Sequence, residues 1–282
     1  MSALPATQHD EDIRQALEAR IASGGLELPL LPDAVMQILN LCQSPDSSAS
    51  ALSAAIHRDP ALAGHIIRVS NSPAYYPGTP IVSLQQAIGR LGQRAIAEIA
   101  VLISVKGSVL NLPAFAPEMA ALWKHAAAAG AWAREIARQR RRPVDAALLC
   151  GLLQNVGVPV ILKALAGLAK EIGTTLEKSE ALALADEYHA EVGAQLARRW
   201  SLPSAVSEAI RHHHTITGCD VGCDDARMTT LSDFLARLTL EETDPERLSA
   251  HDAYAELNLY LDDVAALVAK QSIIVEFVET MR

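Results

Sequence analysis

Short helical segments separated by proline- and asparagine-rich corners occupy residues 28–110, and this pattern limits what the chain can fold into. Apolar residues recur at helical spacing within each segment, as between Val35 and Cys42. The corner at Asn71-Ser72-Pro73 stops one helix, while Asp59-Pro60 can start another. Strand-like alternation does not persist for more than a few positions. The sequence therefore predicts an all-α fold with essentially no β-sheet.

The composition is typical of closely packed helices. Of the 282 residues, 50% are hydrophobic but only 4% are aromatic, and alanine is abundant in almost every segment. Small side chains let helix axes approach closely, which favours helix-on-helix packing over a sandwich of strands rich in aromatic and β-branched residues. The length suffices for one large or two small domains.

The charge and the cysteines indicate where the protein works. A formal charge of −9 and a pI near 5.5 argue against nucleic acid or an anionic membrane as a partner. No apolar run approaches the roughly 18–20 residues of a membrane span, and the acidic start does not resemble a secretory signal. Four scattered cysteines do not form a disulfide framework. We therefore expect a cytoplasmic protein that contacts neither nucleic acid nor membrane.

Four arginines in the five positions from Arg138 to Arg142 end a helix predicted from about Glu118 to Arg140. Such a run could mark an anionic partner. Cations at a helix C-terminus also complement the helix dipole, and Pro143 stops the helix. The acidic overall charge favours this second interpretation.

Four short blocks in the first half carry a family resemblance: Leu28-Pro29-Leu30-Leu31-Pro32, Arg58-Asp59-Pro60-Ala61-Leu62, Val69-Ser70-Asn71-Ser72-Pro73 and Ala87-Ile88-Gly89-Arg90-Leu91-Gly92. In this order they resemble the HDOD domain, an all-helical relative of the HD phosphohydrolases that is found in bacterial signalling proteins. The resemblance covers residues 27–215. It implies an N-terminal helical bundle (27–112) packed on an HD-like bundle (113–215). A tail and helix (1–26) precede this module, and a helical C-terminal extension (216–282) is expected to pack on the HD-like half.

An apolar run from Ala147 to Leu153 ends in two adjacent carboxamides, Gln154 and Asn155, just before Gly157. Polar groups at such a position must be hydrogen-bonded or liganded, because an unsatisfied one costs about 1–3 kcal/mol. The run resembles the centre of the HD superfamily, where a metal-binding His-Asp pair occupies these two positions. The resemblance implies that this chain lacks the metal doublet of the hydrolases.

The same resemblance implies which side chains gather around the two carboxamides: His125, His189, Asp233 and one or more of His212, His213 and His214. Hydrolysis of a phosphoester by two metals needs carboxylates that bridge cations about 3.5–4 Å apart, and neutral amides cannot do this. We therefore expect no catalytic residue, no dinuclear metal and no cofactor. Two alternatives stay open, a hydrogen-bonded remnant that holds helices together and a single metal on His125, His213 and Asp233.

Cys219 and Cys223 follow the histidine triplet closely enough to suggest a structural zinc. Their Cys-x3-Cys spacing is unusual for a zinc knuckle, and the aspartates around them fit a solvated loop. The role of the two cysteines stays open.

The loop from Asn71 to Pro80 carries two adjacent tyrosines between prolines. Prolines stiffen a loop and exposed tyrosines are favoured contact residues, so Asn71, Ser72, Tyr75 and Tyr76 are a candidate interaction loop. The alternative is that the tyrosines cover the N-terminal bundle while Asn71 and Ser72 cap helix ends.

Taken with the resemblance, these features predict a bacterial signalling or regulatory pseudoenzyme that is not catalytic, binds other signalling proteins and is a monomer or a homodimer. Two alternatives belong to other classes. One is a metal-dependent phosphohydrolase with altered ligands, and the other is a sensor that holds a nucleotide or another small ligand in the relict pocket.

Overall fold

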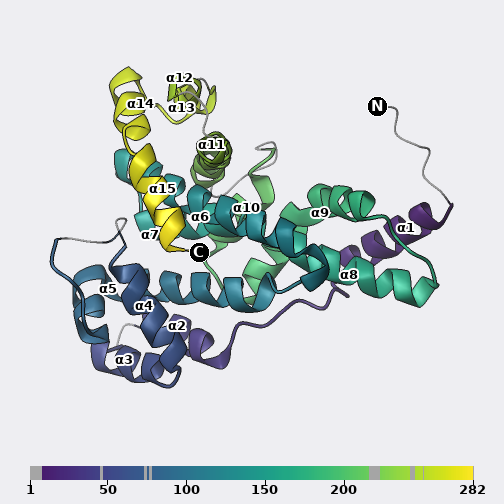
Figure 1. Cartoon of the computed structure of the whole chain (residues 1–282), viewed down its shortest axis with the longest axis horizontal. Coiled ribbons are helices and arrows are strands. Elements are labelled where there is room, and N and C mark those ends of the chain that lie inside the picture. Colours follow the sequence, from purple (N-terminus) through teal and green to yellow (C-terminus); the bar gives the residue numbers. More distant parts are fainter. Residues whose placement is uncertain are drawn as a thin grey trace.

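The structure is a computed structural model that describes residues 8–44, 47–72, 75, 78–215, 223–241, 245–249 and 251–281. It is 78% helical, and no strand occurs among the described residues (Figure 1). The predicted all-α fold is confirmed. The division into domains by residue number stays a prediction.

The N-terminal bundle consists of α2 (Asp33–Gln43), α3 (Ala49–His57), α4 (Pro60–Ser70) and α5 (Leu84–Ser104). Serine and aspartate side chains start three of these helices: Ser48 accepts the N–H of Ala51, Asp59 that of Leu62, and Ser83 that of Gln86. α5 kinks at Gly92, whose φ of 84° suits glycine. The corners of the sequence thus set the helix boundaries in this half.

The helical stretch after Gly92 changes its hydrogen-bonding pattern near its end. After α5, residues Val105–Val109 form a π-helix (η1), and a short 3-10 turn, η2 (Pro113–Phe115), leads into the second half. Gly107 and Ser108 in η1 have low helix propensity, and the Ser108 hydroxyl donates to the backbone oxygen of Ser104 at 2.7 Å.

The second bundle is built around α6 (Ala116–Gln139), whose residues 126–133 are all buried. α7 (Val144–Leu153) and α11 (Cys223–Leu240) pack on α6, whereas α8 (Gly157–Ile172), α9 (Lys178–Arg199) and α10 (Ser204–His212) complete the bundle. A Cβ on Gly151 would lie 2.5 Å from the backbone oxygen of Ala129. The small residues therefore bring α6 and α7 into close contact.

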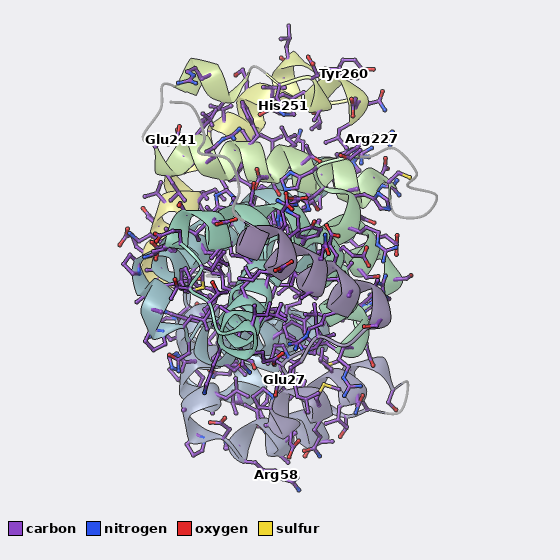
Figure 2. All side chains as sticks on the ribbon, turned by 90° about the vertical axis from the view of Figure 1, so that its right-hand side faces the viewer. Glu27, Arg58, Arg227, Glu241, His251 and Tyr260 are labelled. Carbon is purple, nitrogen blue, oxygen red and sulfur yellow. The ribbon has the colours of Figure 1, made fainter. Side chains whose placement is uncertain are left out.

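Both ends of the chain pack on this second bundle (Figure 1). α1 (Gln8–Ser23) lies beside α8 and α9, where Arg14 forms an ion pair with Glu187 at 2.7 Å. After α12 (Pro245–Leu248), α13 (Ala253–Glu256) and α14 (Leu261–Val268), the last helix α15 (Gln271–Thr280) packs on α6. In Figure 2, Arg58 of the N-terminal bundle and Tyr260 before α14 mark opposite ends of the molecule.

The arginines at the end of α6 make intramolecular contacts. Arg140 donates to the backbone oxygen of Leu257 at 2.9 Å and lies 3.2 Å from Asp224, which also pairs with Arg142. Arg138 pairs with Glu135 on its own helix. These contacts favour the interpretation that the run stabilises a helix end.

One stretch of the described chain, Ala146–Ile172, is long and apolar enough to cross a membrane by length and composition. The expectation that no run approaches this length is therefore wrong. However, 78% of its most apolar window is buried inside the protein. The core helix of a soluble protein passes the same test, because a helix that is covered on all sides by other helices is apolar all round.

Candidate functional site

Gln154 and Asn155 lie in the turn between α7 and α8, and only Val156 separates them from Gly157. A Cβ on Gly157 would lie 2.2 Å from the backbone oxygen of His189 and 2.8 Å from the backbone nitrogen of Gly193. Only glycine permits this approach. The start of α8 is thereby held directly against α9.

A hydrogen-bonded trio forms where this turn meets α6 and α11. The His125 Nε2 and the Gln154 Nε2 both donate to Asp233 Oδ1, at 2.7 Å and 2.8 Å. Gln154 is fully buried, and its Oε1 has no hydrogen-bond partner among the described residues. Three of the predicted positions thus meet, but they bind one another.

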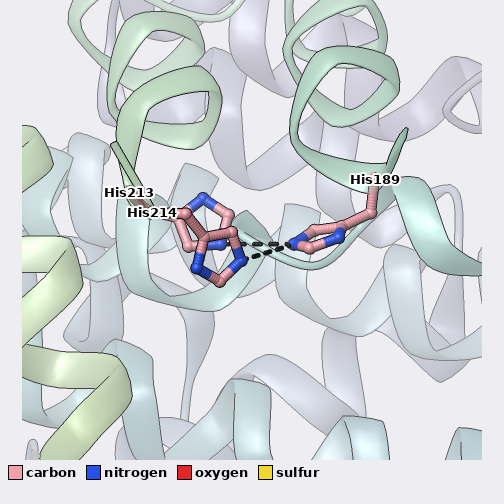
Figure 3. A group of neighbouring side chains, drawn as sticks. All are labelled: His189, His213 and His214. Atoms are coloured by element: carbon pink, nitrogen blue, oxygen red, sulfur yellow. Dashed lines mark hydrogen bonds between the residues drawn. The ribbon is translucent and has the colours of Figure 1, made fainter. Parts of the chain in front are cut away.

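Three histidines form the adjacent part of the site, shown in Figure 3. The Nε2 of His189 lies 3.3 Å from the Nε2 of His213 and 3.1 Å from the Nε2 of His214. One ring nitrogen from each of the three residues lies within 4.8 Å of the others. We call these three residues together with His125, Gln154 and Asp233 the histidine centre.

Backbone carbonyls fix two of these rings. The Nδ1 of His189 donates to the backbone oxygen of Asp186 at 2.6 Å, and the Nδ1 of His213 donates to that of Ile210 at 2.7 Å. This leaves the two Nε2 lone pairs facing each other. Burial lowers the pKa of both rings, and the neighbouring imidazoles lower it further. The rings are therefore neutral near pH 7, which is the form that binds metal.

The carboxyl of Asp233 responds to the same surroundings. Burial alone would raise the pKa of Asp233, but the hydrogen bond from His125 and the charge interactions with the imidazoles lower it overall. Asp233 is therefore a carboxylate that accepts two hydrogen bonds on one oxygen.

A cleft of about 610 Å³ opens onto this centre. Its lining includes His125, His214, Asp233, Asp186 and the half-buried Asn155. Glu118 and Arg237 stand among the other polar lining residues. The fully buried Gln154 does not line this cleft. A ligand in the cleft could reach three members of the histidine centre.

The side chains present do not fit a two-metal centre. The resemblance to the HD hydrolases implies that Gln154 and Asn155 occupy the positions of the metal-binding doublet; both are neutral amides, and Asp233 already accepts two hydrogen bonds. Compared with a His-Asp doublet, Gln154 and Asn155 therefore lack one imidazole ligand and one bridging negative charge.

A single cation fits better. Two Nε2 atoms bonded to one zinc ion at about 2.0–2.1 Å in tetrahedral geometry lie roughly 3.3 Å apart. The two measured separations, 3.3 and 3.1 Å, are close to this value. Carbonyl groups already orient two of the rings, as is usual for metal-binding histidines.

The sequence left open a single metal on His125, His213 and Asp233, but the structure groups these residues differently. Both His125 and Gln154 donate to Asp233, whereas His213 joins His189 and His214. His212 is turned toward Glu208, 3.6 Å away. Sequence reasoning missed the carbonyls of Asp186 and Ile210, which no side-chain pattern reveals, although each lies three residues before its histidine.

The candidate interaction loop is described only in part. Asn71 caps α4, and its side chain bonds the backbone oxygens of Ile67 and Ile81. Ser72 is buried. The half-buried ring of Tyr75 packs edge-on against Phe277, with the Arg134 guanidinium 4.0 Å from its centroid. Tyr76 lies outside the described residues. These contacts favour a structural role for Asn71 and Tyr75.

Cys223 begins α11 and is half-buried. Cys219 lies outside the described residues. The described histidine group that could hold a metal does not include Cys223. The role of this pair stays open.

Comparison with known proteins extends this description. The family model of the HDOD domain matches residues 28–216. An uncharacterized protein of Treponema pallidum (strain Nichols) is 29% identical over 209 residues, which are 71% of this chain and 40% of that protein. The chain thus matches less than half the length of this relative.

Solved structures share the fold. A candidate metal-dependent phosphohydrolase from Shewanella amazonensis SB2B has a TM-score of 0.75 at 19% identity, over 98% of this chain and 100% of that one. An HDOD domain protein of unknown function from Geobacter sulfurreducens has a TM-score of 0.68 at 25% identity, over 96% and 98%. A candidate signal transduction protein from Marinobacter aquaeolei VT8 has a TM-score of 0.65 at 22% identity, over 99% and 67%.

Proposed function

The chain belongs to the HDOD domain family, and on that premise we propose that it is a non-catalytic regulatory module that acts by binding other signalling proteins. The observation that carries the proposal is the buried amide of Gln154, which donates to Asp233 where the hydrolases carry a metal-binding histidine. The likeness to a structure named as a candidate signal transduction protein accords with a regulatory role.

The chemistry of the doublet supports the absence of catalysis. Asp233 accepts hydrogen bonds from both His125 and Gln154, so a bridging metal on Asp233 would have to replace hydrogen bonds that the folded protein already makes. Neutral amides supply no negative charge to hold two cations or to lower the pKa of a bound water.

Elemental analysis of the purified full chain, together with hydrolysis of bis(p-nitrophenyl) phosphate in added Mn²⁺, tests the proposal. We expect no dinuclear metal and no hydrolysis above that of Mn²⁺ in buffer. About two transition metals per chain, with hydrolysis that Asp233→Asn abolishes, would overturn it.

A gain-of-function variant tests the assignment of the doublet. Gln154→His combined with Asn155→Asp should bind Mn²⁺ more tightly than the parent, because it restores an imidazole and a carboxylate. Asn155→Asp alone is the control for added negative charge. If the double variant binds no better than this control, the two positions are not those of the metal doublet.

The partner-binding surface that we propose is the loop from Asn71 to Pro80, with Asn71 and Tyr75 as its scaffold, in a cytoplasmic protein that contacts neither membrane nor nucleic acid. Tyr75 already packs on Phe277 and Arg134, so docking there would involve α15 and α6 as well. With an identified partner, Tyr76→Ala should weaken binding while thermal stability stays within about 0.5 kcal/mol. Unchanged binding in this variant would show that the partner binds to another surface.

A second candidate function follows from the convergence of His189, His213 and His214, which favours a single-metal site with altered ligands. Titration with Zn²⁺ should then saturate at about one ion per chain, because the three imidazoles converge on a single site. The fourth tetrahedral position would stay open. His214→Gln should weaken binding while leaving the two carbonyl-bound rings in place. An unchanged affinity in that variant would exclude this site.

A further inference from the structure

A second cleft, of about 540 Å³, lies between α4 and η1 and shares no lining residue with the cleft of the histidine centre. Apolar side chains such as Val35, Leu62 and Ile103 form much of its wall, and Met281 after α15 closes one side. Its volume lies within the range of about 300–1,000 Å³ typical of small-molecule sites. We call it the basic cleft, for the charges described next.

Two cations from different segments face this cleft, Arg68 of α4 and Lys106 of η1. The Lys106 ammonium donates to the backbone oxygen of Met281 at 2.6 Å. Burial and the charge of Arg68 lower the pKa of Lys106. The one carboxylate in the lining, Asp59, accepts the N–H of Leu62 at the start of α4. Among the described residues, no carboxylate forms an ion pair with Arg68. Positive charge therefore exceeds negative charge in the cleft.

His65 adds a donor to the same wall. The guanidinium of Arg68 donates to the Nδ1 of His65 at 2.6 Å, so the proton of the neutral ring sits on Nε2. Burial lowers the pKa of His65, and the charges of Arg68 and Lys106 lower it further. His65 is thus a neutral hydrogen-bond donor beside two cations.

An unused hydroxyl completes the set. Ser104 lines the cleft with only 8% of its surface exposed, and its Oγ has no hydrogen-bond partner among the described residues. A buried hydroxyl without a partner is costly, and a ligand in the cleft could supply one. It stands directly before η1, and π-helical turns are frequent at functional sites.

We propose that the basic cleft binds a phosphorylated small molecule of nucleotide size, with its phosphate held by Arg68, Lys106 and Ser104. A guanidinium matches phosphate oxygens with two parallel hydrogen bonds, and an ammonium adds a point charge. The rest of the ligand would lie against the apolar wall that includes Val35 and Leu62. Residues of α4 and η1 and Met281 line the cleft, so a bound ligand would contact all three segments. Such a ligand could regulate the module in addition to its protein partners.

Calorimetric titration of the full chain at low salt with inorganic phosphate, pyrophosphate, AMP and adenosine tests this proposal. We expect AMP to bind about tenfold more tightly than adenosine, because a hydrogen bond to a charged group contributes strongly to affinity. Saturable binding of AMP at submillimolar concentration supports the proposal. If none of the three phosphates binds below about 1 mM, it is overturned.

Three variants place the binding site. Arg68→Gln should weaken AMP about tenfold, and Ser104→Ala should weaken it several-fold without lowering the melting temperature, since it removes an unpaired buried hydroxyl. Lys170→Gln, an equal charge change on the exposed end of α8, is the matched control and should stay within about twofold. An equal loss in Lys170→Gln, or no loss in both Arg68→Gln and Ser104→Ala, would overturn the site.

Discussion

A Cβ atom on Gly157 would lie 2.2 Å from the backbone oxygen of His189, whereas a Cβ on Gly64 of the N-terminal bundle would meet no atom within 4 Å. The same contrast holds for Gly151, whose Cβ would meet Ala129 at 2.5 Å, and Gly89, which faces open space. Backbone contact between helices therefore constrains the second bundle. The N-terminal bundle is constrained instead by caps and corners.

The polar side chains of the two bundles also differ, in the number of hydrogen-bond partners that they have within the protein. In the histidine centre, the half-buried side chains of His125 and Asp233 bind each other. In the basic cleft, Arg68 and Ser104 face a cavity with few partners of their own. The polar groups around Asp233 thus bind one another, whereas the Ser104 hydroxyl of the basic cleft has no hydrogen-bond partner among the described residues.

The largest effect that we expect tests the contrast in glycines. Gly157→Ala should lower the free energy of unfolding by about 3 kcal/mol or more, because the added methyl cannot fit against a backbone carbonyl. Gly64→Ala, inside α4, should raise it by about 0.5–1 kcal/mol through helix propensity. Chemical denaturation measures both. Similar losses in the two variants would contradict the contrast.

The next effect tests the hydrogen bond that Asp233 accepts from Gln154 in the histidine centre. Gln154→Glu replaces a donor to Asp233 by a second carboxylate, and should cost about 2–3 kcal/mol at pH 8 because two buried negative charges repel. The new carboxyl would have a raised pKa in the folded protein, so the deficit should shrink as the pH falls toward its unfolded value.

Added Mn²⁺ sharpens this test, because a divalent ion can bind between the two carboxylates and should reduce the deficit. Asn155→Asp, one residue later and half-exposed, is the matched control and should cost less. If both variants lose the same free energy of unfolding, position 154 would be as well solvated as position 155.

A smaller effect concerns the N-terminal bundle. Asn71→Ala removes three hydrogen bonds, two donated to the backbone oxygens of Ile67 and Ile81 and one accepted from the N–H of Ile81. The loss should be about 2 kcal/mol by thermal or chemical denaturation. A loss below about 0.5 kcal/mol would show that Asn71 is not scaffold and would restore its candidacy as a contact residue.

Local rules explain what the sequence predicted of the fold. The start of α4 at Asp59-Pro60 and its end at Asn71 are short-range features, and each lies where the sequence indicated. The π-helix at Val105–Val109 was not predicted, because helical periodicity cannot distinguish it from an α-helix over five residues.

The site was predictable only as far as side chains reveal it. The resemblance placed His125, Gln154 and Asp233 together, and the structure brings them within hydrogen-bonding distance. It did not indicate that Gln154 would bind Asp233 or that His214 would complete a trio with His189, since ring orientation depends on carbonyls brought in by tertiary packing. Arg68 and Lys106 stand 38 positions apart, and neither belongs to a motif, so the basic cleft was not foreseeable.

The smallest effect compares two neighbouring carboxylates at the start of α11. The hydrogen bond from Arg142 lowers the pKa of Asp224, against the effect of burial, and Arg140 lowers it further. Burial raises the pKa of Asp225. A lowered pKa stabilises the fold above the unfolded value of 3.8, and this stabilisation is lost as the pH falls through the folded value. A raised pKa has the opposite sign.

Asp224→Asn should therefore reduce the free energy of unfolding at pH 7 by about 0.5–1 kcal/mol, and the deficit should fade in acid below pH 3.8. Asp225→Asn should leave stability at pH 7 unchanged or raise it, because it removes a buried charge that lacks the direct arginine contacts of Asp224. Denaturation of both variants at pH 7 and in acid measures the difference. If both lose stability equally at pH 7, the arginine run at the end of α6 does not distinguish these carboxylates, and its intramolecular role at this helix end would be in question.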